Sequence, residues 1–101
     1  MTALTIVVLP QGPGGPSHTW TLRCGPPSGT LPRAAAACAR LGALSDPFAP
    51  VPADAMCTQI YGGPEQARVT GVYRGRRVRA LFKRTDGCET ERWARVGFLF
   101  R

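Results

Sequence analysis

Four cysteines carry the most distinctive chemistry of this chain, and they stand at positions 24, 38, 57 and 88. No two form a Cys-x-x-Cys pair, and the chain has a single histidine, so the closely spaced ligands of a zinc site are missing and no metal is expected. An even number of widely spaced cysteines in a small chain is typical of disulfides in an oxidising compartment. Three pairings are possible. The sequential pairing, Cys24 to Cys38 and Cys57 to Cys88, closes the two shortest non-overlapping loops and would contribute about 3 and 3.7 kcal/mol.

Cys57 lies in a short stretch whose composition is typical of a peptide that is exposed for binding. Residues 56–64 read Met-Cys-Thr-Gln-Ile-Tyr-Gly-Gly-Pro, so Cys57 stands two residues before the polar Gln59, and the run ends in glycine and proline. We interpret this stretch as an exposed, extended loop held by a disulfide, because a loop that has already lost conformational entropy costs less to order on binding. The alternative is that Cys57 only ties two elements together.

Catalytic arrangements are not supported elsewhere in the chain. Ser17 directly precedes His18 at the start of a predicted strand, where the side chains of neighbouring residues point to opposite faces. Asp54 and Glu65 flank the 56–64 stretch, but two isolated carboxylates do not make an acid/base pair. No glycine-rich phosphate loop follows a strand and opens a helix. We therefore expect a binding protein with neither enzyme activity nor a cofactor.

The length and composition predict one domain over residues 1–101. The hydrophobic content of 44% permits a folded core. No apolar run approaches the roughly 18 residues of a membrane span, so no membrane partner is expected. Residues 1–9 are apolar but lack a basic segment and a cleavage site, so they are expected to form a first strand. If the protein is secreted, its signal peptide has been removed.

Positive charge is the other compositional signal, with a formal net charge of +7. Four arginines are close together, at 74, 76, 77 and 79, which is a pattern found in nucleic-acid-binding proteins. The alternative is a solvated tip of a β-hairpin, where charge also discourages pairing between sheet edges. We favour the hairpin tip and expect no nucleic-acid partner.

The hydrophobic pattern predicts an α+β fold: an antiparallel sheet of about five strands, with one principal helix and one short helix packed on it. The principal helix is expected over residues 33–44, capped by Thr30, and brings Cys38 against Cys24. The short helix is expected over residues 89–95. The expected strands are 3–10, 18–24, 67–73, 77–82 and 96–100.

These residues resemble the Streptomyces subtilisin inhibitor family, small secreted inhibitors of serine proteases, over nearly the whole length. The resemblance rests on four cysteines in register and on their neighbours. The segments that carry it are 20–24 (Trp-Thr-Leu-Arg-Cys), 28–32 (Ser-Gly-Thr-Leu-Pro), 36–38 (Ala-Ala-Cys), 56–64, 68–71 (Arg-Val-Thr-Gly), 84–89 (Arg-Thr-Asp-Gly-Cys-Glu) and 98–100 (Phe-Leu-Phe). The resemblance implies the sequential disulfides, secretion, and a homodimer that associates through sheet faces.

The resemblance also implies a site. The bond that the protease attacks would be Gln59-Ile60, in a protease-binding loop made of Met56, Cys57, Thr58, Gln59, Ile60 and Tyr61. Gln59 would enter the primary specificity pocket, Cys57 and Thr58 the adjoining subsites, and Met56 the pocket three residues upstream. Gln59 offers no charge to the buried aspartate with which trypsin selects lysine or arginine. A subtilisin-like serine protease is therefore the expected partner.

Cys88 and Asp86 are the expected supports of this loop. Family members often carry asparagine before glycine where this chain has Asp86. That amide would donate a hydrogen bond to the loop backbone, whereas an ionised carboxylate can only accept one. Asp86 is therefore expected to support the loop less well, or to act through water or Arg84.

Two other classes of function are alternatives. A basic module centred on Arg74 to Arg79 could bind nucleic acid or another acidic surface. Gln59 on an exposed loop could instead serve as a transglutaminase substrate, or a second surface could inhibit a metalloprotease.

Overall fold

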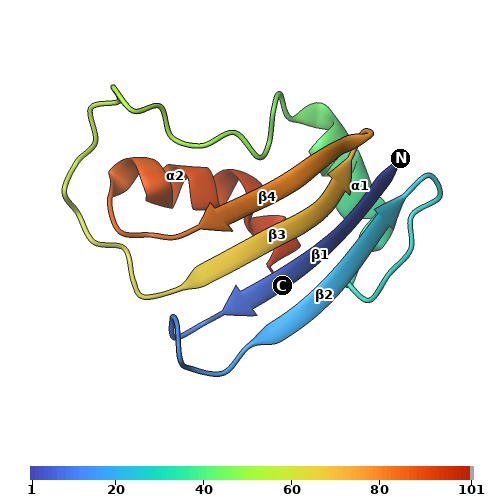
Figure 1. Cartoon of the computed structure of the whole chain (residues 1–101), viewed down its shortest axis with the longest axis horizontal. Coiled ribbons are helices and arrows are strands. Elements are labelled where there is room, and N and C mark those ends of the chain that lie inside the picture. The colour runs from blue at the N-terminus through green and yellow to red at the C-terminus, as the bar shows by residue number, and fades with distance from the viewer. Residues whose placement is uncertain (101) are drawn as a thin grey trace.

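Four antiparallel strands form a single sheet in the order β2-β1-β3-β4, and two helices follow β2 and β4 in the chain. This computed structural model describes residues 1–100 (Figure 1). The elements are β1 (Thr2–Leu9), β2 (His18–Cys24), α1 (Ala34–Ala43), β3 (Gln66–Tyr73), β4 (Arg76–Phe82), α2 (Gly87–Val96) and the 3₁₀ turn η1 (Gly97–Leu99). The predicted α+β class is confirmed, with four strands where about five were expected.

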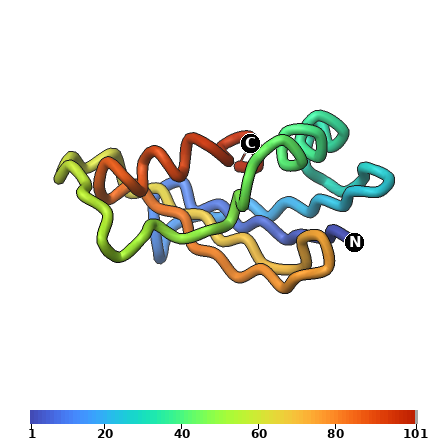
Figure 2. The backbone as a smooth tube through the Cα atoms, turned by 90° about the horizontal axis from the view of Figure 1, so that it is seen from above, coloured from blue at the N-terminus to red at the C-terminus, as the bar shows by residue number. Residues whose placement is uncertain are grey.

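The core lies between one face of the sheet and the two helices. Strand side chains alternate between the two faces, and the inward set is buried. Figure 2 shows both helices on the same side of the sheet. Leu41 of α1, Val96 of α2 and Leu99 of η1 are each at most 1% exposed. They pack against the inward strand residues Leu4, Ile6, Val8, Leu22, Ala67, Val69, Val78 and Phe82.

The hairpin between β3 and β4 forms where the sequence predicts it. Tyr73 pairs with Arg76, so only Arg74 and Gly75 make the turn. Both have positive φ, 49° and 79°. A two-residue turn of this kind matches the twist of the flanking strands, and glycine adopts its second position without steric cost.

The predicted fifth strand, residues 96–100, does not form. Val96 ends α2, and residues 97–99 continue as η1. Val96 and Leu99 are both fully buried and stand three residues apart, which is the spacing of a helical turn and not of a strand. The ring of Phe100 lies 4.5 Å from that of Trp93. A short apolar run fits either structure by pattern alone, and packing of this segment onto α2 and the core selects the helical one.

The start of α1 also differs from the prediction. Thr30 does not cap the helix: its hydroxyl accepts from the backbone N–H of Thr21 at 2.8 Å, and its own N–H donates to the Thr21 hydroxyl at 3.1 Å. Thr30 therefore fastens the preceding turn to β2. The helix begins three residues later than a Thr30 cap requires, after Arg33 in a left-handed conformation. Within the part of the chain described, neither helix is long and apolar enough to cross a membrane.

Both predicted disulfides are confirmed. Cys24–Cys38 joins β2 to α1, with the two Cα atoms 5.7 Å apart. Cys57–Cys88 joins the long connection between α1 and β3 to the start of α2, with a Cα separation of 5.3 Å. Figure 1 shows this connection passing beside β4 and around the start of α2 before it enters β3. Because residues 44–65 contain neither helix nor strand, cross-links of this kind determine their position.

Arg92 of α2 is a polar link between this connection and β4. It donates from Nε to the carbonyl of Ala49 at 2.8 Å and from a terminal nitrogen to the carbonyl of Leu81 at 2.6 Å. Its guanidinium also lies 4.0 Å from the centre of the Phe82 ring. Burial lowers the pKa of Arg92, and the nearby carboxylate of Glu89 partly offsets this effect.

We predict that Arg92→Met lowers the free energy of unfolding by about 2–4 kcal/mol, since two carbonyls lose a charged donor. Arg95→Met is the matched control, because Arg95 is exposed and donates only to the carbonyl of Ser45. The control should cost less than about 1 kcal/mol. Urea denaturation followed by tryptophan fluorescence measures both values. Equal losses for the two variants would show that Arg92 does not have this role.

Candidate functional site

Residues 55–63 contain neither helix, strand nor turn, and the large apolar side chains of this segment face solvent. Met56 is 97% exposed, Ile60 70% and Tyr61 64%, whereas apolar residues of similar size elsewhere are mostly buried. Thr58 and Gln59 are exposed as well. Several exposed large apolar groups on one short segment are characteristic of surfaces that bind another macromolecule. We call residues 56–61 the exposed loop.

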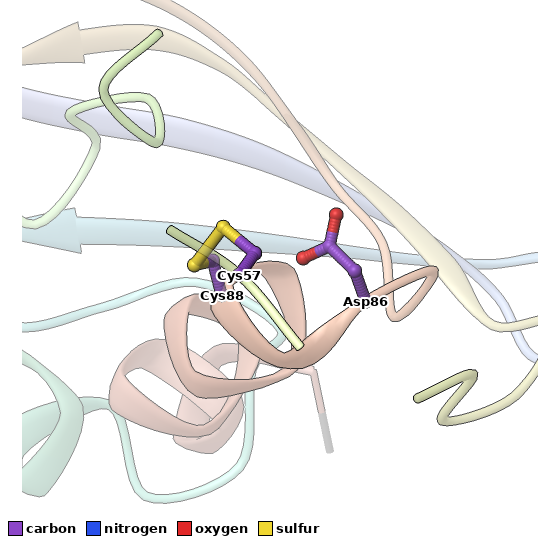
Figure 3. A group of neighbouring side chains, drawn as sticks. All are labelled: Cys57, Asp86 and Cys88. Carbon is purple, nitrogen blue, oxygen red and sulfur yellow. A yellow bond between two sulfur atoms is a disulfide. The ribbon is translucent and has the colours of Figure 1, made fainter. Parts of the chain in front are cut away.

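The exposed loop is anchored on its N-terminal side by the start of α2. Cys57 is bonded to Cys88, and the N–H of Gly87 donates to the carbonyl of Thr58 at 2.9 Å. Figure 3 shows the disulfide at the beginning of this helix, with Asp86 next to it. One covalent bond and one backbone hydrogen bond therefore fix two consecutive residues.

The C-terminal side of the loop is anchored by the segment that precedes α2. The N–H of Gly62 donates to the carbonyl of Arg84 at 2.7 Å. Gln59, Ile60 and Tyr61 lie between this anchor and the one at Thr58. None of these three has a hydrogen bond to the body of the protein, within the residues described. Gln59 donates from its side chain only to the nearby carbonyl of Cys57, at 3.4 Å.

Two glycines allow the loop to lie this close to its supports. A Cβ atom at Gly87 would stand 2.1 Å from the Thr58 hydroxyl oxygen, and one at Gly62 would stand 2.7 Å from that of Thr90. Each distance is too short for a non-bonded contact. A side chain at either position would therefore displace a threonine side chain, and the constraint is one of space, since neither glycine has a positive φ. Sequence reasoning did not identify these two residues as supports.

Arg84 contributes its side chain in addition to its carbonyl. Its guanidinium forms an ion pair with Glu65, the residue before β3. The pKa of Glu65 is lowered below the ordinary 4.5, first by the N–H of its own backbone and then by the hydrogen bond and charge of Arg84, against desolvation. The carboxylate thus stays ionised above pH 4.5, and the ion pair is lost only as the pH falls through the lowered pKa.

Asp86 caps the helix that carries Cys88. Its carboxylate accepts from the N–H of Glu89 at 2.9 Å and so caps α2, which begins at Gly87 and not at Glu89. Among the described residues it makes no hydrogen bond to the exposed loop or to Arg84. The loop receives its backbone hydrogen bond from the next residue, Gly87. Asp86 therefore supports the loop indirectly, by fixing where α2 starts.

Cys57, Asp86 and Cys88 also form a compact group of potential metal ligands, within 4.8 Å of one another. Both sulfur atoms belong to the disulfide, so neither is a thiolate that could bind a metal ion. Elsewhere, His18 lies at the start of β2, is exposed, and stacks against Trp20 with ring centres 6.2 Å apart. Neither the disulfide with Asp86 nor His18 therefore indicates a metal site or a catalytic site.

Comparisons with known proteins give a consistent result. A family model described as subtilisin inhibitor-like matches residues 2–85, a range that includes the exposed loop and Arg84. Subtilisin inhibitor-like protein 4 of Streptomyces lavendulae is 39% identical over 107 residues, covering 97% of this chain and 90% of that protein. A probable subtilase-type protease inhibitor of Streptomyces avermitilis is 46% identical over 66 residues, covering 62% of this chain and 45% of its relative.

We predict that Gly87→Val releases the N-terminal anchor of the exposed loop. A single methyl group could be accommodated by rotation of the Thr58 hydroxyl, whereas a β-branched side chain would press on the loop itself. Loss of one hydrogen bond should raise the rate at which a broad-specificity protease cuts residues 57–62 by about three- to ten-fold. Cleavage is followed by mass spectrometry.

Gly97→Val is the matched control, because no atom lies within 4 Å of a Cβ at Gly97 and it lies in the same C-terminal segment. It should leave cleavage of residues 57–62 at the rate of the unmodified protein. If Gly87→Val leaves this rate unchanged too, the hydrogen bond from Gly87 does not hold the loop.

Proposed function

The chain belongs to the subtilisin inhibitor-like family, and on that premise we propose that it inhibits subtilisin-type serine proteases through residues 56–61, bound like a substrate. Membership of an inhibitor family agrees with the expectation that the chain is not an enzyme. One observation carries the proposal: the loop exposes Met56, Ile60 and Tyr61 to solvent, and it is anchored on both sides to the same short segment, residues 84–88.

The bond that the protease attacks is Gln59-Ile60 in this proposal. It lies between the anchors at Thr58 and Gly62, so both residues of the bond are free to enter a protease cleft. Before the protease binds, the residues on each side of the Gln59-Ile60 bond are already restricted to nearly one conformation. Such preorganisation reduces the entropy lost on binding, which strengthens a complex without any added contact.

The same anchors account for slow turnover of the inhibitor. If the protease cuts between Gln59 and Ile60, the new carboxyl end remains attached through Thr58 and Cys57. The new amino end remains attached through Gly62. Two ends that are held close together have a high effective concentration. The peptide bond therefore re-forms faster than the cut inhibitor dissociates from the protease. A flexible peptide of the same sequence would separate after cleavage.

The side chains of the exposed loop define the class of protease. Gln59 occupies the primary specificity pocket, where it has no charge to match the aspartate of trypsin. A broad pocket that reaches solvent accepts this side chain, because its amide keeps hydrogen bonds to water. Met56, 97% exposed, fills an apolar upstream subsite and adapts to its shape. These features favour subtilisin-like enzymes.

The setting of this activity is extracellular in our proposal. Both pairs of cysteines are joined as disulfides, which persist in an oxidising environment and are rare in the reducing cytosol. A secreted inhibitor would meet secreted proteases there. The homodimer that the family resemblance implies stays a prediction.

We predict that titration of subtilisin with the protein abolishes protease activity at close to one loop per enzyme. Long incubation should yield one new cleavage product, cut between Gln59 and Ile60, because the anchors present only that bond. Activity assays with mass analysis of the incubated inhibitor test both statements. Absence of inhibition at micromolar protein would refute the function, and a cut at any other bond would refute the site.

We also predict that Gln59→Lys gains inhibition of trypsin by about a hundred-fold, as a buried aspartate that acquires a charged partner contributes about 3 kcal/mol. Inhibition of subtilisin should be retained. Gln11→Lys is the matched control, since it adds the same charge at an exposed turn position. Equal trypsin inhibition by the two variants would show that Gln59 is not the residue that the protease selects.

A further inference from the structure

Glu65 and Arg84 continue the pairing of β3 with β4 past the ends of the two strands. Ala67 lies opposite Phe82, so Glu65 and Arg84, each two residues further along, lie opposite one another. Side chains two residues apart on a strand share a face, and Ala67 and Phe82 are both fully buried on the face that the helices cover. The ion pair between Glu65 and Arg84 is therefore the next cross-strand contact on that face. Figure 1 shows the beginning of β3 next to the end of β4.

Arg84 holds residues 62–65 at both of their ends. Its backbone carbonyl accepts from the N–H of Gly62 at 2.7 Å, and its guanidinium pairs with the carboxylate of Glu65. Glu65 directly precedes β3, which is an interior strand of the sheet. The ion pair thus connects Arg84, and through it the C-terminal end of the exposed loop, to the middle of the sheet.

The backbone at Gly63 allows the Glu65 side chain to fold back over this segment. Gly63 has a φ of 143°, a conformation that residues with a side chain rarely adopt. A Cβ atom at Gly63 would also overlap the Glu65 carboxylate. Pro64 restricts the backbone between them. The order Gly-Pro-Glu at positions 63–65 therefore places the carboxylate beside Arg84.

The ion pair is the contact that fixes the side chain of Arg84. Residues 83–86 contain neither helix nor strand. Within residues 1–100 the Arg84 guanidinium forms no other ion pair or hydrogen bond, and its Nε is buried without a partner. The Arg84 carbonyl, which holds Gly62, is thus coupled to Glu65 through a single residue.

The position of this segment matters once a protease has cut the loop. In the acyl-enzyme of a serine protease, the carbonyl carbon of Gln59 is esterified to the catalytic serine, and Ile60 carries a free amine. Attack of the amine on that carbon re-forms the C–N bond and breaks the ester C–O bond, and the proton lost by the amine returns to the serine oxygen. Attack by water completes hydrolysis instead. While Gly62 stays bound, the two-residue connection keeps the amine within about 7 Å of its anchor.

From this arrangement we propose that Glu65 and Arg84 are positioning residues, which keep the Ile60 amine close to the acyl carbon and so determine how much inhibitor is lost to hydrolysis. This role rests on the proposed function and deepens it. Neither residue is part of the reactive bond: Glu65 acts through Arg84, and Arg84 acts through Gly62. Restraint of this kind raises the effective concentration of the amine at the carbon that it attacks.

General stabilisation of the fold is a weaker explanation of the ion pair. The side chains of Arg84 and Glu65 are 30% and 28% exposed, and ion pairs that reach solvent contribute little to the free energy of unfolding. An ion pair that joins the end of the loop to the sheet instead acts on local geometry. Positioning and stabilisation therefore predict different results when the pair is removed.

The test compares the variants Glu65→Gln, Arg84→Gln and the two changes together. Glu91→Gln is the matched control, because Glu91 is exposed on α2 and forms no ion pair within the described residues. Each protein is mixed with subtilisin, and two rates are measured: the initial rate of inhibition and the rate at which mass spectrometry detects the cut at Gln59-Ile60. Glu65→Gln should be cut about ten-fold faster, while its initial rate of inhibition changes by less than about two-fold.

The double variant tests whether the two residues act as a pair. Because each side chain works only through the other, removal of both should accelerate cutting by no more than about two-fold beyond either single variant. Glu91→Gln should be cut at the rate of the unmodified protein. Incubation of purified cut protein with subtilisin gives a second readout: the fraction in which the bond re-forms should fall in the three variants and not in the control.

Different results refute the function and the positioning role. If the unmodified protein does not inhibit subtilisin, the proposed function fails and the positioning role fails with it. If the unmodified protein inhibits but Glu65→Gln is cut no faster, only the positioning role fails. Equal acceleration in Glu65→Gln and Glu91→Gln would show a general effect of charge. New cuts outside Gln59-Ile60, together with a lower midpoint of urea unfolding, would show general loosening. Each of the last two results also overturns the positioning role and leaves the function intact.

Discussion

The Cys57–Cys88 bond is the constraint on which the site depends. The connection that it holds, residues 44–65, has no helix or strand to define its path. Its position therefore follows from that of α2, to which the disulfide attaches it. The helix is fixed in turn by Val96, which is fully buried, and by Arg92, which reaches two carbonyls outside the helix. Packing of α2 against the sheet, together with the contacts of Phe48 with Tyr73 and Phe82, thus determines where an otherwise irregular segment lies.

A single structural segment holds both sides of the exposed loop. Arg84 accepts the hydrogen bond from Gly62, while Gly87 and Cys88 hold Thr58 and Cys57. Because residues 84–88 are short and end in a capped helix, the two anchors move together. A loop tied to two independent elements would be distorted whenever those elements shifted. This arrangement suits a loop that must keep one geometry before and after it meets a protease.

The charges of the molecule are separated between its two sides. All six carboxylates lie in the long connection, in the residue before β3, or at the start of α2. Arg84 and Arg92 pair with carboxylates there, whereas no ion pair within residues 1–100 engages Arg23, Arg68, Arg77 or Arg79 on the uncovered face of the sheet. Part of the excess positive charge therefore lies on the uncovered face of the sheet, and another part lies on the helix side, at Arg33, Arg40 and Arg95. The net charge calculated from the composition does not reveal this distribution, because the distribution depends on which strand residues point outward.

The sequence by itself determined the features that depend on local order along the chain. The pattern of apolar residues predicted about five strands, of which four form, and cysteine spacing together with the family resemblance predicted the two disulfides and the loop around Gln59. The tertiary structure decided the rest. It made residues 96–100 helical and used Thr30 to fasten a turn. Asp86 became a helix cap, and Gly62, Arg84 and Gly87 became the anchors. These outcomes depend on contacts between segments distant in sequence, which a local pattern does not encode.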